Sequence, residues 1–414
     1  MIPKAKLIGC NLYGHVRVSP LALRIIDTPE FQRLKQIKQL GLCWNVFPAA
    51  THTRFEHSIG TYHLTGKMLD KIREQYPTKK YQIMELNGSY ELTPDIMEMI
   101  KIAGLCHDIG HGPFSHIFDD VILKNSTHSN KSHEVRSCLI VEEICKRETT
   151  ISDSNINFIK SLIHPSEQHN GVLYQIVSNY LNGIDVDKFD YLTRDSYNLG
   201  LRKGINPCRI IDELVIDENE NISYPKHCSS DILDMFYTRY ILHKQIYTHK
   251  TVIIVESMIK DIIQCIDPIY KISESIQNMD SFCALNDSTI FHLVQFGDVT
   301  DPRIIKAKEI YKRLLNRQLY KIIFSTYDTS LLEKIQRFAE EQEDLKVVIT
   351  KIGFVNGDKS PFSNVFFYDN REDSKSFTMN NNHISGILTS DFQESRILLL
   401  CTNNYDYWVK KFHL

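Results

Sequence analysis

Apolar residues recur at helical spacing over most of the first 320 positions, which predicts a predominantly helical chain. Residues 93–95 (Thr-Pro-Asp) supply an N-cap, a proline at the first helical position and an early acidic side chain, so a helix should begin there. The segment 110–113 (Gly-His-Gly-Pro) should end it. Ser132 can cap a second helix. Residues 231–266 lack proline and glycine and predict one long helix.

The pattern changes after about residue 340. Apolar runs and alternation predict strands over Lys346–Phe354, Asn364–Asp369, Ser376–Met379 and Arg396–Cys401. Residues 217–226 resemble a small hairpin, and the first 20 residues are turn-rich. We therefore expect a mainly α fold, in which a large helical domain (1–330) carries a smaller mixed α/β C-terminal lobe (331–414).

Composition narrows the functional classes. The 414 residues carry a formal net charge of -3, so overall charge does not draw the chain to nucleic acid or to an anionic membrane. No apolar run approaches 18 residues, and no secretory leader is visible, so we expect neither a membrane span nor secretion. Ten cysteines without CxxC pairs indicate reduced thiols and a cytoplasmic or nuclear protein.

Histidines and carboxylates cluster in three separate segments. A divalent metal that activates water favours neutral imidazoles and carboxylates, with positions left open for water and substrate. His57, the adjacent pair His107-Asp108, and Asp187 supply two groups of each kind. The adjacent pair can bind one ion only where a helix ends and the backbone turns, which Gly110 permits.

Further histidines follow the His-Asp pair. His111, His116 and His133 can titrate near neutrality and so take part in proton transfer. His116 and Asp119 are three residues apart, so the carboxylate could orient the imidazole on a helical turn. The alternative interpretation is that these are surface or capping histidines.

Two helix faces could bind a phosphorylated ligand. Asp187, Tyr191 and Asp195 share one face with Lys188. On the long predicted helix, a second face combines cationic and aromatic side chains at i, i+4, i+8 and i+11: Arg239, His243, Tyr247 and Lys250. Such a stripe suits a polyphosphate with an attached ring. Taken alone it would be a solvated basic face, and only the neighbouring metal motif favours a ligand site.

These segments resemble a known family. The four predicted ligands match the pattern of HD-domain phosphohydrolases. Longer blocks, at residues 24–34, 37–41, 102–116, 182–191 and 234–239, resemble the SAM-and-HD-domain deoxynucleoside triphosphate triphosphohydrolases. The resemblance covers roughly residues 1–330 and, more weakly, the C-terminal lobe. It includes no SAM domain, so we expect the chain to begin at the catalytic part.

The resemblance implies an enzyme that hydrolyses a dNTP at the α-phosphate to a deoxynucleoside and triphosphate. A divalent metal (Fe, Zn, Mn or Mg) would polarise the phosphate and supply hydroxide, with Mg²⁺ on the triphosphate. His116 would be the general acid, oriented by Asp119, and His111 and His133 would line the α-phosphate pocket. The implied substrate contacts are Arg54, Lys188 and Arg239 around the triphosphate, and Gln39, Asp195, Leu40, Tyr247 and Tyr191 around the sugar. His243 is a further implied substrate contact.

Family members also bind regulatory nucleotides and assemble into dimers or tetramers. The corresponding positions in this chain are Lys6, Leu7, Asp27, Gln32, Lys35, Arg209, Lys308 and Lys312. Lys35 replaces an arginine of the family and lacks its bidentate fork. Residues 6–14 lack the usual Asn and Asp-Pro, and the segment 224–231 differs. These departures imply less dependence on GTP or dNTP activation, or a different activator.

Two other classes are weighed against this interpretation. An HD phosphodiesterase or nuclease would act on cyclic or oligomeric nucleotides, but Gln39, Leu40, Asp195 and Tyr247 favour a closed deoxynucleotide pocket. A non-catalytic nucleotide or nucleic-acid binder would have lost metal ligands or catalytic histidines, and every one is present.

Overall fold

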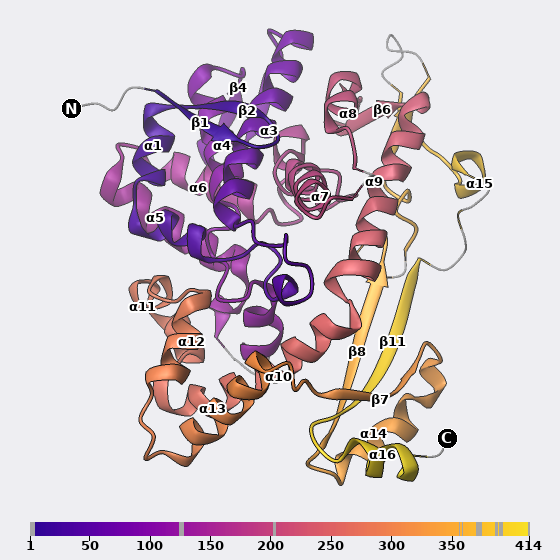
Figure 1. Cartoon of the computed structure of the whole chain (residues 1–414). Coiled ribbons are helices and arrows are strands. Elements are labelled where there is room, and N and C mark those ends of the chain that lie inside the picture. Colours follow the sequence, from indigo (N-terminus) through magenta and orange to yellow (C-terminus); the bar gives the residue numbers. More distant parts are fainter. Residues whose placement is uncertain are drawn as a thin grey trace.

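The computed structural model describes residues 5–123, 128–201, 204–355, 357, 359–369, 375–385, 388 and 392–412. The chain is mainly helical (Figure 1). The helices are α1 Pro20–Ile26, α2 Pro29–Gln32, α3 Arg54–Gln75, α4 Pro94–Cys106, α5 His133–Glu148, α6 Asp153–Ile163, α7 Val186–Asn198, α8 Pro207–Glu213, α9 Ser229–Leu242, α10 Lys250–Tyr270, α11 Met279–Cys283, α12 Asp287–Phe296, α13 Pro302–Leu315, α14 Leu332–Glu340, α15 Asn381–Ile384 and α16 Tyr405–Lys411. No helix within the described ranges has the length and apolar character needed to cross a bilayer.

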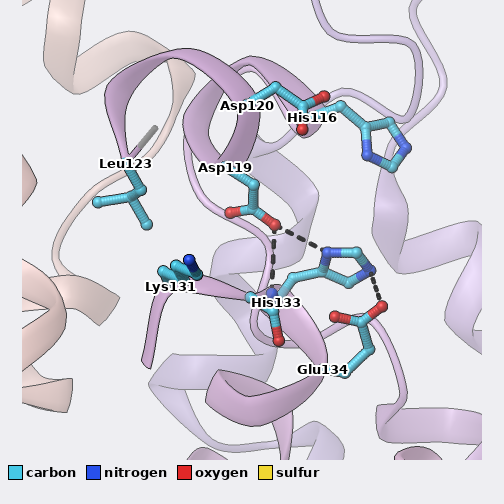
Figure 2. Close-up of a pocket in the computed structure, with 8 residues that line it drawn as sticks. His116, Asp119, Asp120, Leu123, Lys131, His133 and Glu134 are labelled. Atoms are coloured by element: carbon cyan, nitrogen blue, oxygen red, sulfur yellow. Dashed lines mark hydrogen bonds and ion pairs between the residues drawn. The ribbon is translucent and has the colours of Figure 1, made fainter. Parts of the chain in front are cut away.

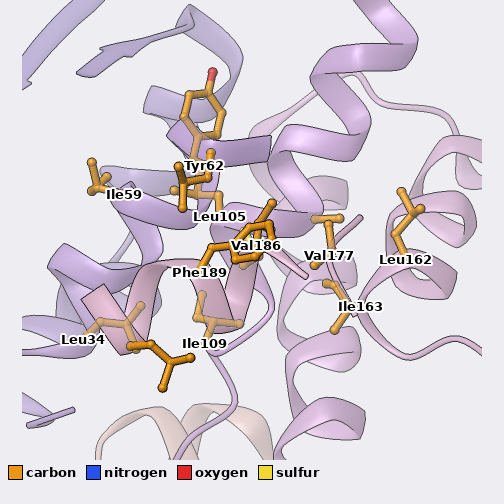
Figure 3. Close-up of a cluster of buried hydrophobic side chains, with 14 of the residues drawn as sticks. Leu34, Ile59, Tyr62, Leu105, Ile109, Leu162, Ile163, Val177, Val186 and Phe189 are labelled. Atoms are coloured by element: carbon orange, nitrogen blue, oxygen red, sulfur yellow. The ribbon is translucent and has the colours of Figure 1, made fainter. Parts of the chain in front are cut away.

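Helices α3, α4 and α7 form the centre of the helical part. α3 packs against α4 and α7, and α6 packs against α4 and α5. Apolar side chains of α3, α4 and α7 gather in one buried cluster, in which Figure 3 shows Ile59, Leu105, Val186 and Phe189. Each of these residues lies within two positions of a predicted metal ligand. Burial of one helix face therefore fixes the direction in which the neighbouring polar side chains project.

The predicted helix starts are confirmed. Thr93 accepts a hydrogen bond from the Ile96 N–H at the start of α4, and Ser132 accepts one from the Val135 N–H at the start of α5. Each side chain satisfies a backbone donor that the first helical turn leaves without a partner.

The prediction of one helix over residues 231–266 is wrong. α9 ends at Leu242, a π-helical turn covers His243–Tyr247, and α10 begins at Lys250. The backbone leaves the helical region at His249 (ψ 137°), whose side chain caps α10. Lys250 therefore lies beyond the break and does not continue the stripe of Arg239, His243 and Tyr247.

The strands of the described chain are β1 Lys6–Cys10, β2 Gly14–Val18, β3 Tyr81–Ile83, β4 Gly88–Tyr90, β5 Val215–Ile216, β6 Ile222–Pro225, β7 Lys321–Thr326, β8 Leu345–Gly353, β9 Phe366–Tyr368, β10 Phe377–Thr378 and β11 Gln393–Cys401.

Strands of the C-terminal segment take part in two sheets. β11 pairs antiparallel with β7 and β8. Leu398 and Leu400 of β11 face the main core, whereas Ile397 and Leu399 pack in a second cluster with Trp408 of α16. This alternation is the period-2 pattern that predicted a strand here.

The second sheet joins distant parts of the chain. Its order is β10-β9-β6-β5, and β6 and β9 are parallel. The predicted hairpin at 217–226 is thus present as β5 and β6, with strands of the C-terminal segment beside it. The first residues also form a hairpin, β1 and β2, rather than turns alone. The fold class is as predicted, and the boundary near residue 330 stays a prediction.

Gly110 lies where α5 approaches the turn after α4. A Cβ there would lie 2.2 Å from the His133 carbonyl oxygen and 2.4 Å from the Ser137 nitrogen, both backbone atoms that cannot move independently. We expect Gly110→Ala to lower the free energy of unfolding by about 1–3 kcal/mol, measured by denaturant titration. Gly9→Ala is the control, because a Cβ there meets nothing within 4 Å. Equal midpoints for the two variants would contradict the packing argument.

Candidate active site

Three helix ends bring the predicted metal ligands together. A capping box of Thr53 and Glu56 starts α3, which places His57 in its first turn. His107 and Asp108 follow the last residue of α4, where the Ile109 N–H bonds back to the Cys106 carbonyl. The side chain of Asp185 caps α7 and places Asp187 in its first turn.

The ligand atoms converge on one point. His57 Nε2 lies 3.2 Å from His107 Nε2, 3.2 Å from Asp187 Oδ1 and 3.4 Å from Asp108 Oδ2. His107 Nε2 lies 3.3 Å from Asp187 Oδ1 and 3.5 Å from Asp108 Oδ1. Ligands about 2.1 Å from a shared cation lie roughly 3.0–3.5 Å apart. His57, His107 and Asp187 at this spacing fit a divalent cation, and Asp108, which also contacts His111, lies beside them.

The opposite side of each imidazole is held by a fixed acceptor. His57 Nδ1 lies 2.8 Å from Asp190 Oδ2, and Asp190 in turn accepts two hydrogen bonds from Arg194 (2.7 and 2.9 Å). His107 Nδ1 lies 2.8 Å from the Gly104 carbonyl oxygen. Since each Nδ1 donates, both Nε2 lone pairs face the centre. Asp190 was not among the predicted site residues, although it lies three residues after Asp187 on the same helix.

The carboxylates at this centre remain ionised. Burial alone would raise the pKa of Asp108, but His107, Arg54 and His111 lower it well below its usual value. Burial likewise opposes ionisation of Asp187, yet the adjacent side chains of His107 and His57 lower its pKa well below normal. Arg54 already pairs with Asp108, and a bound cation would add positive charge beside the Asp187 carboxylate.

A histidine cluster adjoins the metal ligands, and Figure 2 shows two of its members, His116 and His133. The rings of His111 and His133 stack at 3.9 Å, and His116 lies edge-on to both, 5.2 and 5.9 Å away. His111 Nε2 lies 3.4 Å from Asp108 Oδ1, which connects the cluster to the ligand set. His116, Asp119 and His133 line a pocket of about 380 Å³. The structure thus brings the four predicted catalytic side chains together.

The partner of Asp119 differs from the prediction. Asp119 Oδ2 accepts from His133 Nδ1 (2.8 Å) and from the His133 backbone N–H (3.2 Å), and Arg136 donates to Oδ1. Within the described residues Asp119 makes no hydrogen bond to His116, so that part of the prediction is wrong. The reason is local: Ser115 has φ 58°, and a π-helical turn from Phe118 directs Asp119 to the N-terminus of α5.

The histidines of the cluster differ in charge. Burial alone would lower the pKa of His133, but the hydrogen bond to Asp119 and the carboxylate of Glu134 raise it above the usual histidine value. His116 is solvent-exposed at its edge, yet the surrounding protein, Arg54 and His133 lower its pKa to about 4. At neutral pH, His116 is therefore neutral in the free protein, whereas His133 holds a proton more readily than an ordinary histidine.

The predicted phosphate-binding residues lie around this centre with partners of their own. Arg54 is buried, and it donates to Asp108 and, at 3.0 Å, to Ser115 Oγ. Lys188 Nζ lies 3.0 Å from Asp185 Oδ2. Burial raises the pKa of the Tyr191 hydroxyl, while Arg239 and Lys188 nearby oppose the shift.

The π-helical turn after α9 places its side chains beside the histidine cluster. Burial, with Arg239 and His116 nearby, lowers the pKa of His243 to about 3. The rings of His243 and Tyr247 lie 5.0 Å apart, edge to face. Arg239 donates to the Gly353 carbonyl oxygen at 2.8 Å, so the end of β8 contacts this face.

A polar triad lies at the predicted sugar side. Tyr247 donates to Asp195 Oδ2, and His52 Nε2 lies 2.7 Å from Asp195 Oδ1. The Gln39 N–H donates to the His52 carbonyl oxygen (3.0 Å), and Leu40 follows, partly buried against the core. Gln39 Oε1 is buried and has no partner among the described residues. Sequence analysis missed His52, because a lone histidine outside the motif carries no spacing signal.

The predicted regulatory residues near the N-terminus lie on β1 and in the segment 27–35. Lys6 and Leu7 lie on β1, and Leu7 is exposed. Asp27 follows α1 and is exposed. Gln32 accepts a hydrogen bond from Lys35 Nζ at 2.7 Å.

The remaining regulatory positions lie elsewhere. Arg209 pairs with Asp231 at 3.3 Å, and Lys308 donates to the Gly297 carbonyl oxygen at 3.1 Å. Lys312 is exposed on α13. Figure 1 shows α13 at the opposite end of the helical part from β1. One chain therefore does not bring Lys308 and Lys6 together.

Known proteins share this arrangement of segments. A family model described as HD domain matches residues 54–195. The chain is 50% identical to the HD domain-containing protein L394 of Acanthamoeba polyphaga mimivirus, over 97% of this chain and 93% of that protein. It is 35% identical to the deoxynucleoside triphosphate triphosphohydrolase SAMHD1 homolog of Dictyostelium discoideum (96% and 77%) and 32% identical to SAMHD1 of Homo sapiens (96% and 70%). The chain therefore belongs to the SAMHD1 family of HD-domain deoxynucleoside triphosphate triphosphohydrolases.

Proposed function

We propose that this protein hydrolyses dNTPs at the α-phosphate, releasing a deoxynucleoside and inorganic triphosphate. The convergence of His57, His107, Asp108 and Asp187 beside a histidine cluster is the observation that carries the proposal. The names of the SAMHD1 relatives support the substrate class. HD-type phosphodiesterase or nuclease activity is the alternative.

The four convergent side chains would hold a divalent cation, of which Fe, Zn, Mn and Mg are the candidates, and Mg²⁺ would accompany the triphosphate. A cation bound there supplies a Lewis acid for the α-phosphate and a source of hydroxide at neutral pH. Asp190 and the Gly104 carbonyl keep the imidazoles in the orientation that binding requires.

The histidine cluster would move the proton to the departing 5′-oxygen. His116 is neutral in the free protein, so it becomes a general acid only when the negative charge of a bound triphosphate raises its pKa. His133, whose pKa is raised by its hydrogen bond to Asp119, would provide positive charge beside the reacting phosphate, and His111 would line the same pocket. Asp119 thus acts on His133 rather than on His116.

Charge on the triphosphate would be neutralised by Arg54, Lys188 and Arg239, with His243 beside them. Each of the three cations already has a protein partner, which fixes its side chain before the substrate arrives. Fixed cations lose little rotational entropy on binding phosphate and so favour the charged transition state.

The sugar would lie between the Gln39–Leu40 segment and the Asp195–Tyr247 pair, with Tyr191 nearby. Asp195 would accept the hydrogen bond that the 3′-hydroxyl donates, and the Gln39 amide would lie beside the same hydroxyl. Leu40 and the ring of Tyr247 would form an apolar wall at the 2′ position, where a ribose hydroxyl meets no partner.

Widening this wall should admit ribonucleotides. We expect the double variant Leu40→Gly/Tyr247→Ala to raise the ratio of kcat/KM for ATP to that for dATP by at least about tenfold. Leu21→Ala on α1 is the control and should leave the ratio unchanged. An unchanged ratio in the double variant would place the 2′ filter elsewhere.

Ion-exchange chromatography tests the activity itself. The protein is incubated with dGTP and, separately, with a cyclic dinucleotide, in the presence of Mg²⁺ or Mn²⁺. Released triphosphate supports the proposal. Intact dGTP with a cleaved cyclic dinucleotide would establish the phosphodiesterase instead.

Activation by GTP or a dNTP and assembly into a homo-oligomer are also part of the proposal. Lys6 on β1 and Lys308 on α13 lie far apart in one chain, so a nucleotide that contacts both must bridge two copies. A cytoplasmic or nuclear location is proposed because none of the ten cysteines forms a disulfide. Sedimentation with and without GTP, combined with dNTP hydrolysis, tests both activation and assembly.

A further inference from the structure

His52 is a buried histidine that none of the roles above uses. Its side chain is 4% exposed, and its Nε2 atom lies 2.7 Å from Asp195 Oδ1, whose own side chain is 1% exposed. The other ring nitrogen, Nδ1, is buried and has no partner within the described part of the chain. A buried polar atom without a partner is uncommon and calls for an explanation.

His52 and Gln39 are neighbours across a short antiparallel pairing. Lys38 and Thr53 form an isolated bridge, and the Gln39 N–H donates to the His52 carbonyl oxygen. Gln39 and His52 are therefore directly opposite each other, and opposite residues in an antiparallel pair project to the same side. Each carries a buried atom without a partner, Gln39 Oε1 and His52 Nδ1. Two such atoms on one side indicate a place where a polar ligand completes the hydrogen bonding.

The carboxylate of Asp195 is held from two directions. His52 occupies Oδ1 and Tyr247 occupies Oδ2, so the plane of the carboxylate is fixed. A carboxylate has about four lone-pair sites, so each oxygen can still accept a hydroxyl. If His52 were removed, Asp195 would lose its donor on one side while remaining buried, and it would be free to rotate about its side-chain bonds.

We propose that His52 is a positioning residue that aims Asp195 at the 3′-hydroxyl of the substrate sugar, an inference that rests on the proposed dNTP hydrolysis. His52 acts through Nε2, which donates to Oδ1 and leaves a lone pair directed to the sugar. The role concerns recognition of one hydroxyl group, so it predicts an effect that depends on whether the substrate has that group.

The test compares dATP with 2′,3′-dideoxyATP, which differs only by the missing 3′-hydroxyl. His52→Leu removes the donor at similar size, and His52→Gln keeps an N–H donor near the Nε2 position. We expect His52→Leu to lower kcat/KM for dATP about ten- to a hundredfold, mainly through KM, and to change that for dideoxyATP little. His52→Gln should restore most of the wild-type ratio of kcat/KM for dATP to kcat/KM for dideoxyATP.

A merely structural role gives a different result. If His52→Leu lowers activity on both substrates by the same factor, or if His52→Gln behaves like His52→Leu, the inference is overturned. If the wild-type protein releases no triphosphate from dATP, the proposed function fails instead. Equilibrium dialysis of dATP and dideoxyATP against wild type and His52→Leu then tests the inference alone, because equal loss of affinity for the two nucleotides would contradict it.

Discussion

Asp187→Ala is expected to abolish turnover of dNTPs, with a loss of more than about 10³-fold. Asp187 Oδ1 lies 3.2 Å from His57 Nε2 and 3.3 Å from His107 Nε2, so no other carboxylate oxygen faces both imidazoles so closely within the described residues. Without it, three ligands remain, one of them the Asp108 carboxylate that also binds Arg54. Triphosphate release and the metal content of the purified protein measure the effect.

The matched control is Asp153→Ala. Asp153 is, like Asp187, an acidic residue in the first turn of a helix, but it is exposed on α6. The Asp153→Ala variant measures how much stability is lost when a negative charge is removed from a helix N-terminus, and this loss is small. If Asp187→Ala retained both turnover and a full metal content, Asp187 would not be a ligand.

The second large effect is expected for His116→Ala. The rate should fall about 10² to 10⁴-fold while the metal content stays unchanged, because the side chain lies beside the ligand set and not in it. The free protein should bind substrate with His116 neutral, since its pKa is about 4. Below about pH 4, His116 is already protonated when the substrate binds. Above that pH, His116 can donate a proton only if the bound triphosphate raises the pKa of its imidazole.

This dependence can be measured by comparing pH profiles. If His116 is the proton donor, the high-pH limb of kcat, which reports the substrate complex, should disappear in His116→Ala. His164→Ala, which removes an exposed histidine after α6, is the control. An unaltered rate in His116→Ala would remove this residue from proton transfer.

Local signals predicted those features that depend on near neighbours along the chain. The caps at Thr93 and Ser132 work through hydrogen bonds to residues three positions away, so spacing alone reveals them. The single helix over 231–266 failed because its break at His249 involves neither proline nor glycine. The side chain of His249 instead caps the next helix, and a cap inside an apolar run leaves no distinct sequence pattern.

Side-chain partners across the fold were harder to predict. Asp119 was assigned to His116 by spacing, but positive φ at Phe114 and Ser115 turns the chain, and Asp119 faces α5 instead. Asp190 belongs to a motif that was noticed, yet its contact with His57 spans 133 positions. Such contacts depend on how α3 and α7 pack against each other. Hydrophobic periodicity predicts that each helix has a buried face, but not which residues of the two faces meet.

The contact between Arg239 and the Gly353 carbonyl has a consequence for truncated chains. Three further contacts join the same two regions: Tyr240 stacks on Phe354 at 5.0 Å, Lys244 pairs with Glu394 at 2.9 Å, and Arg396 donates to the Thr248 carbonyl. A protein shortened before β8 would retain every candidate metal ligand. It would lose the contacts that hold the Arg239 side chain in place. On the proposed roles, we expect such shortened chains to keep the metal site and to lose affinity for the triphosphate.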